Sequence, residues 1–167
     1  LTEAASAVEA AGKQGKTVLF VGTKDEVAGQ VKAAATAVGA PYVTNRWIGG
    51  MLTNFSEIKK RIERLKHLIT EKESGELERK YVKKERVVIN REIEKLTYNF
   101  GGMIEMEKRP DVMVVVDPRN ESIAIAEANE LKIPVVAVMS SDCDASKVQY
   151  PVVVNDSLRA SVSLAMS

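Results

Sequence analysis

The stretch PDVMVVVDPRNESIAIAEANELKIPVVAV, Pro110–Val138, decides the fold that the sequence predicts. Near its start lies an uninterrupted apolar run, VMVVV, which suits a strand buried on both faces of a sheet. An amphipathic helix is predicted over Asn120–Leu131, and a second buried strand over Pro134–Val138. A strand, a helix and a strand in this order predict parallel pairing through a right-handed crossover.

The same alternation continues on both sides of this stretch. Before it we expect a helix over Leu1–Gln14, a strand over Thr17–Val21, a helix over Asp25–Val38 and a brief strand at Tyr42–Val43. After it we expect a strand over Pro151–Val154 and a last helix to about Met166, capped by Asn155 or Asp156. The sequence therefore predicts an α/β fold, a three-layer α/β/α sandwich around a parallel sheet of roughly five strands.

One segment interrupts this alternation. Apolar residues recur there at helical steps of four, three and four, first at Ile58, Ile62, Leu65 and Ile69 and again at Ile89, Ile93, Leu96 and Phe100. Because Gly75 separates the two series, they predict an antiparallel helical hairpin with a short turn. Residues 1–54 and 101–167 would then form the body of the protein, and residues 55–100 a hairpin insertion.

Charge is concentrated on this predicted hairpin. The whole chain has a net charge of +1, so its composition does not indicate a strong field that attracts nucleic acid. Residues 56–98, however, contain 13 basic and nine acidic side chains, whereas the remainder has a net charge of −3. A basic segment on a mildly acidic body indicates a local contact surface, although a solvated helix face explains the same charges.

Composition also excludes some classes of protein. The single cysteine, Cys143, rules out an internal disulfide framework and fits a reducing compartment. No apolar run approaches the 18 or so residues that a membrane span requires, so no membrane partner is expected. No signal peptide is visible, but the sequence does not begin with methionine.

A second notable stretch is YVTNRWIGGMLTN, Tyr42–Asn54, which places Arg46, Trp47 and a glycine pair within five residues. Paired glycines permit positive φ angles, and an arginine beside a tryptophan offers a charged fork next to a flat stacking face. Two interpretations stay open: a contact site, or a structural turn in which Trp47 fills the core. We expect Arg46 to face RNA phosphate or a neighbouring protein, and Trp47 to anchor the loop against the sheet edge and the hairpin base. Thr53 and Asn54 are expected to cap the following helix.

Two predicted strand ends are candidates for a catalytic or ligand site. Gly22-Thr23-Lys24 follows a strand and opens a helix, where a phosphate can bind, but it matches neither GxGxxG nor a Walker motif. Asp117 ends the next long strand, and no second strand-end carboxylate or histidine is expected to join it. An ordinary turn is the favoured interpretation of both.

The remaining candidate for metal or nucleophilic chemistry is Cys143. It is flanked by Asp142 and Asp144, but the only histidine, His67, lies on the predicted hairpin. We therefore predict no metal, no cofactor and no catalytic residue.

Several motifs together resemble a known family. They are FVGTK at Phe20–Lys24, RWIGGMLTNF at Arg46–Phe55, the hairpin that ends in FGGM, the stretch Pro110–Val138 and NDSLR at Asn155–Arg159. In this order and spacing they resemble the small-subunit ribosomal protein S2 family of the bacterial or organellar type. The resemblance spans most of the chain.

This resemblance implies a non-catalytic structural protein that binds small-subunit rRNA and neighbouring ribosomal proteins, and that in many bacteria helps to dock protein S1. It implies a ribosome in the bacterial cytoplasm, or in a plastid or mitochondrion, with no small-molecule substrate. Together with the charge pattern, it leads us to expect RNA contacts at Lys24, Arg46, Trp47, Asn54, Lys59, Lys60, Arg61, Lys83, Lys84 and Arg86.

The chain departs from the family pattern in three places. The family's opening segment, rich in His, Trp and basic residues, has no counterpart here. SSDCDA at Ser140–Ala145 replaces a sequence close to DTNCDP, and Val153-Val154 replaces a Pro-Gly turn. The first difference removes family rRNA contacts from view, and the other two affect any metal or partner role at that edge.

Two alternatives belong to other classes of protein. One is a nucleotide- or phosphate-binding α/β enzyme that uses Gly22-Thr23-Lys24, for which a second phosphate or metal motif would be needed. The other is an interaction module whose hairpin pairs with a partner coiled coil, for which apolar heptads on an outer face would be needed.

Overall fold

The computed structural model describes residues 2–166 and contains one five-stranded sheet. All its neighbouring strands pair in parallel, in the order β2-β1-β3-β4-β5. The strands are β1 Val18–Val21, β2 Tyr42–Val43, β3 Val112–Val116, β4 Val135–Met139 and β5 Tyr150–Val153. The predicted parallel sheet of about five strands is confirmed.

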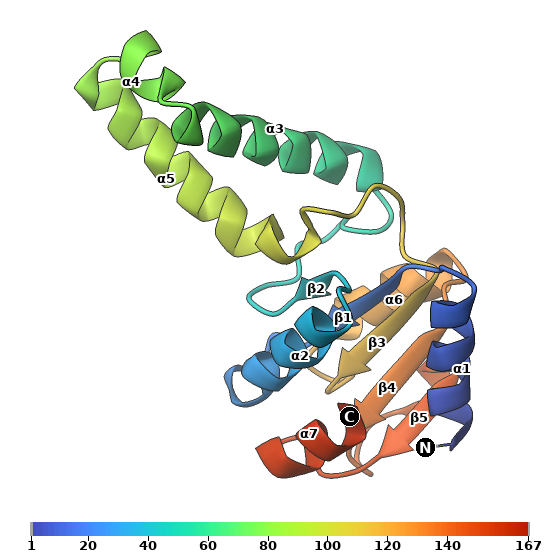
Figure 1. Cartoon of the computed structure of the whole chain (residues 1–167). Coiled ribbons are helices and arrows are strands. Elements are labelled where there is room, and N and C mark those ends of the chain that lie inside the picture. Colours follow the sequence, from blue (N-terminus) through green and yellow to red (C-terminus); the bar gives the residue numbers. More distant parts are fainter. Residues whose placement is uncertain (1, 167) are drawn as a thin grey trace.

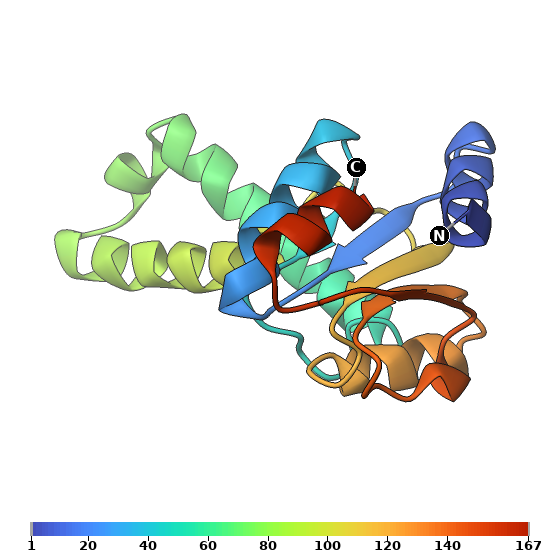
Figure 2. The same ribbon diagram turned by 90° about the horizontal axis from the view of Figure 1, so that it is seen from below.

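Helices cover both faces of this sheet (Figures 1 and 2). One face packs against α1 Thr2–Lys13, α2 Asp25–Ala37 and α7 Arg159–Met166. The other face packs against α6 Ser122–Glu130, together with the loop that follows β2. The predicted three-layer sandwich is confirmed. Because both faces of the sheet are covered by helices, its central strands are apolar at every position.

Side-chain alternation along the strands divides the core into two halves. Leu19 and Val21 of β1 belong to the cluster on the α6 side, whereas Phe20 belongs to the cluster with α1 and α2. This follows from strand geometry, in which successive side chains point to opposite faces. Every residue of β3 and β4 is buried, so these two strands form the centre of the core.

The insertion forms an antiparallel helical hairpin that projects from the body (Figure 1). Its long helices are α3 Phe55–Glu73 and α5 Lys83–Phe100. The connection differs from the expected short turn, since Gly75 leads into a five-residue helix, α4 Glu76–Lys80. Leu77 of this helix is buried in the seam between α3 and α5, so the connection closes the end of the hairpin.

The predicted apolar series on the hairpin has two separate roles in the structure. Near the tip, Leu65 and Ile89 pack within the hairpin itself. Near the base, Ile58, Ile62 and Phe100 belong to the core of the body. The hairpin base is therefore continuous with the body core, which limits its freedom to rotate as a separate unit.

The last helix begins later than the sequence predicts. It starts at Arg159, and Asp156 does not cap it, because Asp156 Oδ2 accepts the Ser140 N–H at an N–O distance of 3.0 Å. Asn155 Oδ1 instead accepts the Ser157 N–H in a local turn. The prediction was wrong because a long-range contact with the end of β4 takes the carboxylate of Asp156 away from the helix.

Gly102 provides a test of how the hairpin returns to the body. It lies in the short helical turn η1 Gly101–Met103, against Tyr42 of β2, and a Cβ atom there would lie 2.2 Å from the Tyr42 carbonyl oxygen. We expect Gly102→Ala to lower the free energy of unfolding by at least about 1–3 kcal/mol, the usual cost of overpacking.

Gly49→Ala is the matched control, because a Cβ atom there meets no heavy atom within 4 Å and Gly49 has no positive φ. Urea denaturation of both variants measures the difference. Equal stability of the two variants would show that η1 does not pack closely against β2.

Candidate nucleic-acid interface

A buried carboxylate holds the loop between β2 and α3. Glu127 of α6 is 8% exposed, and its Oε1 accepts the Trp47 indole N–H at 3.2 Å and the Gly50 N–H at 2.8 Å. Its Oε2 accepts the N–H groups of Leu52 at 2.9 Å and Thr53 at 3.1 Å. Converging N–H groups of this kind form a binding site for an anion, and here the anion belongs to the protein.

These donors also determine the protonation of Glu127. Burial by itself raises the pKa of the carboxyl, but the N–H groups of Leu52, Gly50 and Thr53 and the Trp47 indole together outweigh it. The net pKa of Glu127 is therefore lowered from its ordinary value. The charged form is the one that stabilises the loop.

The same network separates the two adjacent residues Arg46 and Trp47. Trp47 is 9% exposed and packs in the core, so the interpretation of the ring as a core residue is confirmed. Arg46 is exposed and has no recorded ion pair within residues 2–166. Of this predicted pair of RNA-contacting residues, only Arg46 therefore presents its side chain to solvent.

The expected helix caps at the start of α3 do not form. Asn54 occupies the N-cap position, but its side chain makes no capping hydrogen bond. The Thr53 hydroxyl bonds Glu127 Oε2 at 3.3 Å instead of capping the helix. Asn54 is exposed, as a contact residue must be.

Lys24, another predicted contact residue, lies at the carboxyl edge of the sheet. Its ammonium is 3.3 Å from Asp117 Oδ2 and 2.9 Å from the Ser157 hydroxyl oxygen. Asp117 ends β3 with a φ of 61° and is 7% exposed. Lys24 is thus half-buried and already paired within the chain, whereas Arg46 is not.

The expectation that no second strand-end carboxylate joins Asp117 is wrong. Asp156, which follows β5, and Cys143, which follows β4, each place a possible ligand atom within 4.8 Å of the others and of Asp117. Both carboxylates have protein partners, from Lys24 and from the Ser140 N–H, and we assign no ion to the cluster. Sequence reading missed it because three separate strand ends contribute.

The predicted hairpin cations fall into two groups. Lys60 pairs with Glu57 at an N–O distance of 2.7 Å, and the half-buried Arg86 lies 4.0 Å from Glu78. Arg61, Lys83 and Lys84 are exposed, with no ion pair recorded in the described part of the chain, and Lys59 is half-buried. The three exposed and unpaired cations are the best placed to meet an external anion.

Glu127 was absent from the sequence predictions, although two signals together could have revealed it. It lies on the buried stripe of α6, between Ala124 and Ala128, where a charged residue needs partners. The glycine pair Gly49–Gly50 indicates a loop whose backbone N–H groups need acceptors. The two signals lie about 75 residues apart in the sequence, and only the fold brings them together.

Comparison with known proteins identifies the family of this chain. The family model described as Ribosomal protein S2 matches residues 1–167. The chain belongs to the ribosomal protein S2 family. This is a family of structural ribosomal proteins and not of enzymes.

Three relatives illustrate the similarity. Small ribosomal subunit protein uS2c of Emiliania huxleyi is 41% identical over 167 residues, which is all of this chain and 72% of the relative. The uS2 protein of Dictyoglomus thermophilum is 44% identical over 167 residues, all of this chain and 68% of the relative. That of Acidothermus cellulolyticus is 46% identical over 151 residues, 90% of this chain and 55% of the relative.

The names of these S2-family relatives place them in bacterial and plastid ribosomes, which agrees with the expected location. Within residues 2–166, none of the helices has the length and apolar character that crossing a membrane requires.

The Glu127 network gives a pH-dependent prediction. At pH 7 we expect Glu127→Gln to cost about 1–3 kcal/mol, because an amide NH₂ then faces backbone N–H groups that lose their acceptor. Since the folded pKa is lowered, the stabilisation by the carboxylate is complete at neutral pH. This stabilisation is lost as the pH falls below the ordinary pKa of a glutamate and through the lowered pKa that Glu127 has in the folded protein.

Denaturant melts between pH 7 and pH 3 measure both effects. The wild-type protein should lose stability in the acid range, and Glu127→Gln should lose less. Glu130→Gln, at an exposed position of α6, is the control and should behave as wild type. Identical pH profiles for wild type and Glu127→Gln would contradict the assigned role.

The adjacent residues Arg46 and Trp47 should respond differently to truncation. Trp47→Ala removes a buried ring and its hydrogen bond to Glu127, and should cost about 3–5 kcal/mol of unfolding free energy. Arg46→Ala should change stability by no more than about 0.5 kcal/mol, as at other exposed sites. Urea denaturation of the two variants measures the difference. If Arg46→Ala is destabilised and Trp47→Ala is not, the assignment of Trp47 as the inward residue and Arg46 as the outward one is reversed.

Proposed function

We propose that this S2-family protein is a structural component of the small ribosomal subunit that binds small-subunit rRNA and neighbouring ribosomal proteins. The observation that carries the proposal is a hairpin that projects from the body and presents Arg61, Lys83 and Lys84 to solvent without intrachain ion pairs among the described residues (Figure 1). Relatives that span the whole chain are named as small-subunit ribosomal proteins.

The chemistry of these cations favours contacts with the RNA backbone. Lysine and arginine neutralise phosphates without reading the sequence, and double-stranded RNA is recognised mainly by its shape, phosphates and 2′-hydroxyls. The hairpin therefore supplies affinity and orientation. Arg46, at the base of the hairpin, adds a cation on the body itself.

The body is suited to a different kind of neighbour. Outside residues 56–98 the net charge is −3, which disfavours wide contact with RNA and favours contact with basic ribosomal proteins. Docking of protein S1 on this body is part of the proposal and is supported by the family resemblance.

The alternative, a nucleotide-binding enzyme, loses its support at Gly22-Thr23-Lys24. Thr23 is bonded to Glu121 and Lys24 to Asp117, so the groups expected to hold a phosphate already have partners. The family is also not one of enzymes.

Charge reversal on the hairpin tests the proposal. Arg61→Glu, Lys83→Glu and Lys84→Glu, combined in one variant, should weaken binding to small-subunit rRNA and flatten its salt dependence. Counterion release predicts that the log–log slope falls by about 0.7–0.9 for each phosphate contact that is lost. Binding measured between low and physiological salt gives this slope, and sedimentation shows whether the protein travels with the small subunit.

The matched control carries the same change in charge at exposed lysines of the body, Lys13→Glu, Lys16→Glu and Lys132→Glu. It should leave the slope almost unchanged. If both triple variants behave alike, the hairpin has no special role. If the hairpin variant keeps the wild-type slope, its cations form only a solvated helix face.

A further inference from the structure

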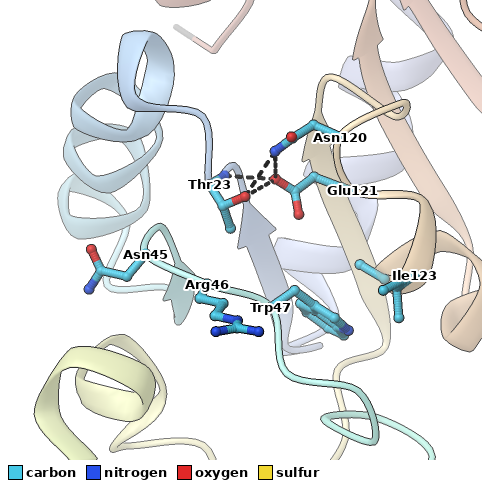
Figure 3. Close-up of a pocket in the computed structure, with 8 residues that line it drawn as sticks. Thr23, Asn45, Arg46, Trp47, Asn120, Glu121 and Ile123 are labelled. Atoms are coloured by element: carbon cyan, nitrogen blue, oxygen red, sulfur yellow. Dashed lines mark hydrogen bonds between the residues drawn. The ribbon is translucent and has the colours of Figure 1, made fainter. Parts of the chain in front are cut away.

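A small pocket lies where the direction of the sheet connections changes. From β1 the chain passes to β2 on one side and, after the hairpin, to β3 on the other. In open parallel sheets, ligands bind outside the carboxyl ends of the strands at such a point. The pocket there has a volume of about 200 Å³ and is lined by Thr23, Asn45, Arg46, Trp47, Asn120, Glu121, Ile123 and Ala124 (Figure 3).

The carboxylate of Glu121 is buried but only partly used. Glu121 is 2% exposed, and its Oε1 accepts the Thr23 N–H at 2.8 Å, the Thr23 hydroxyl and the Asn120 amide at 2.9 Å. Its second oxygen takes no recorded hydrogen bond within residues 2–166 and points away from these donors, toward Trp47 (Figure 3). This oxygen is not one of the fully buried atoms that lack a partner, so it is open to the pocket and can accept a hydrogen bond from an external donor.

The other residues of the pocket indicate what kind of ligand carries that donor group. Arg46 is exposed beside the pocket with no recorded intrachain ion pair among the described residues, and Ile123 is 59% exposed and offers an apolar wall. Asn45 donates its amide N–H to the Tyr98 carbonyl at 2.7 Å, which fixes this loop against the hairpin. The volume of the pocket is below the roughly 300–1,000 Å³ of sites that enclose drug-sized ligands, so it admits a group no larger than about one ring system.

We propose that this pocket binds the base of an unpaired RNA nucleotide that carries an exocyclic amino group. The amino group of adenine, cytosine or guanine donates to the free Glu121 oxygen, the ring packs on Ile123, and Arg46 contacts a phosphate of the same strand. Uracil fits poorly, because it has no amino group and its carbonyl oxygens flank its single N–H. This inference rests on the proposed RNA binding and names the nucleotide that one site takes.

A basic side chain of a neighbouring protein is the main competitor for Glu121. A lysine or arginine that reached Glu121 would lie close to Arg46, which lines the same pocket, and the two positive charges would repel each other. A neutral base attached to an anionic phosphate meets both residues favourably. The charge arrangement therefore favours RNA.

Base preference is the direct test. Fluorescence anisotropy with single-stranded hexamers of A, C and U should show that wild type binds A and C at least about fivefold tighter than U, a ratio equal to about 1 kcal/mol. Glu121→Gln keeps an oxygen for Thr23 and Asn120 and puts an NH₂ donor in the pocket. The preference for A and C should then disappear or reverse toward U.

Two further variants separate the contributions of phosphate and base. Arg46→Gln should weaken binding of all three hexamers by the same factor and lower the salt slope by about 1. Ile123→Glu changes an exposed side chain and leaves the Thr23–Glu121 bonds intact, so it tests the pocket even if Glu121→Gln fails to fold. It should weaken binding of A and C by about tenfold, which corresponds to about 1.4 kcal/mol. Glu130→Gln is the control and should match wild type.

A photocrosslinker at position 123 extends the test to the small subunit. A crosslink to an RNA base supports the inference, and a crosslink to a protein side chain overturns it. Equal affinity for all three hexamers also overturns it, while the proposed function stands if the hairpin variant still loses rRNA binding. Failure of the wild-type chain to bind any RNA would overturn both.

Discussion

The buried carboxylate of Glu127 is the interaction on which this structure depends. It satisfies the N–H groups of Gly50, Leu52 and Thr53 and the indole of Trp47 in a loop that would otherwise bury unpaired donors. Each such donor left unpaired costs about 1–3 kcal/mol. Because this loop joins β2 to α3, the same carboxylate fixes where the hairpin begins.

Other contacts complete the attachment of the hairpin. The Asn45 amide donates to the Tyr98 carbonyl near the end of α5, and the Arg109 guanidinium donates to the Thr53 carbonyl at 3.3 Å. Ile58 and Phe100 continue the core of the body into the hairpin base. A basic surface held in this way keeps a defined orientation, as binding to a structured RNA by shape requires.

The carboxyl edge of the sheet gathers most of the buried charge in residues 2–166. Asp117, Glu121 and Asp156 all lie there, each with an intrachain partner. In an enzyme this edge would hold catalytic groups. Here the side chains mainly bond one another and the loops, and the free oxygen of Glu121 is the exception from which the base pocket is inferred.

The sequence by itself determined the elements that depend on local pattern. The runs VMVVV and PVVAV gave buried parallel strands, and the spacing of Ile58, Ile62 and Leu65 gave a hairpin helix, because periodicity is a property of neighbouring residues. The sequence did not predict the helix α4 or the late start of α7. Both depend on contacts with residues distant in the sequence: Leu77 packs between α3 and α5, and Asp156 accepts the Ser140 N–H. The sequence predicted Trp47 as the anchor of its loop and Arg46 as the outward contact, but only the tertiary structure decided what holds the ring inward. The physical reason is that a carboxylate 80 residues away, Glu127, bonds the Trp47 indole, and no local pattern contains that contact.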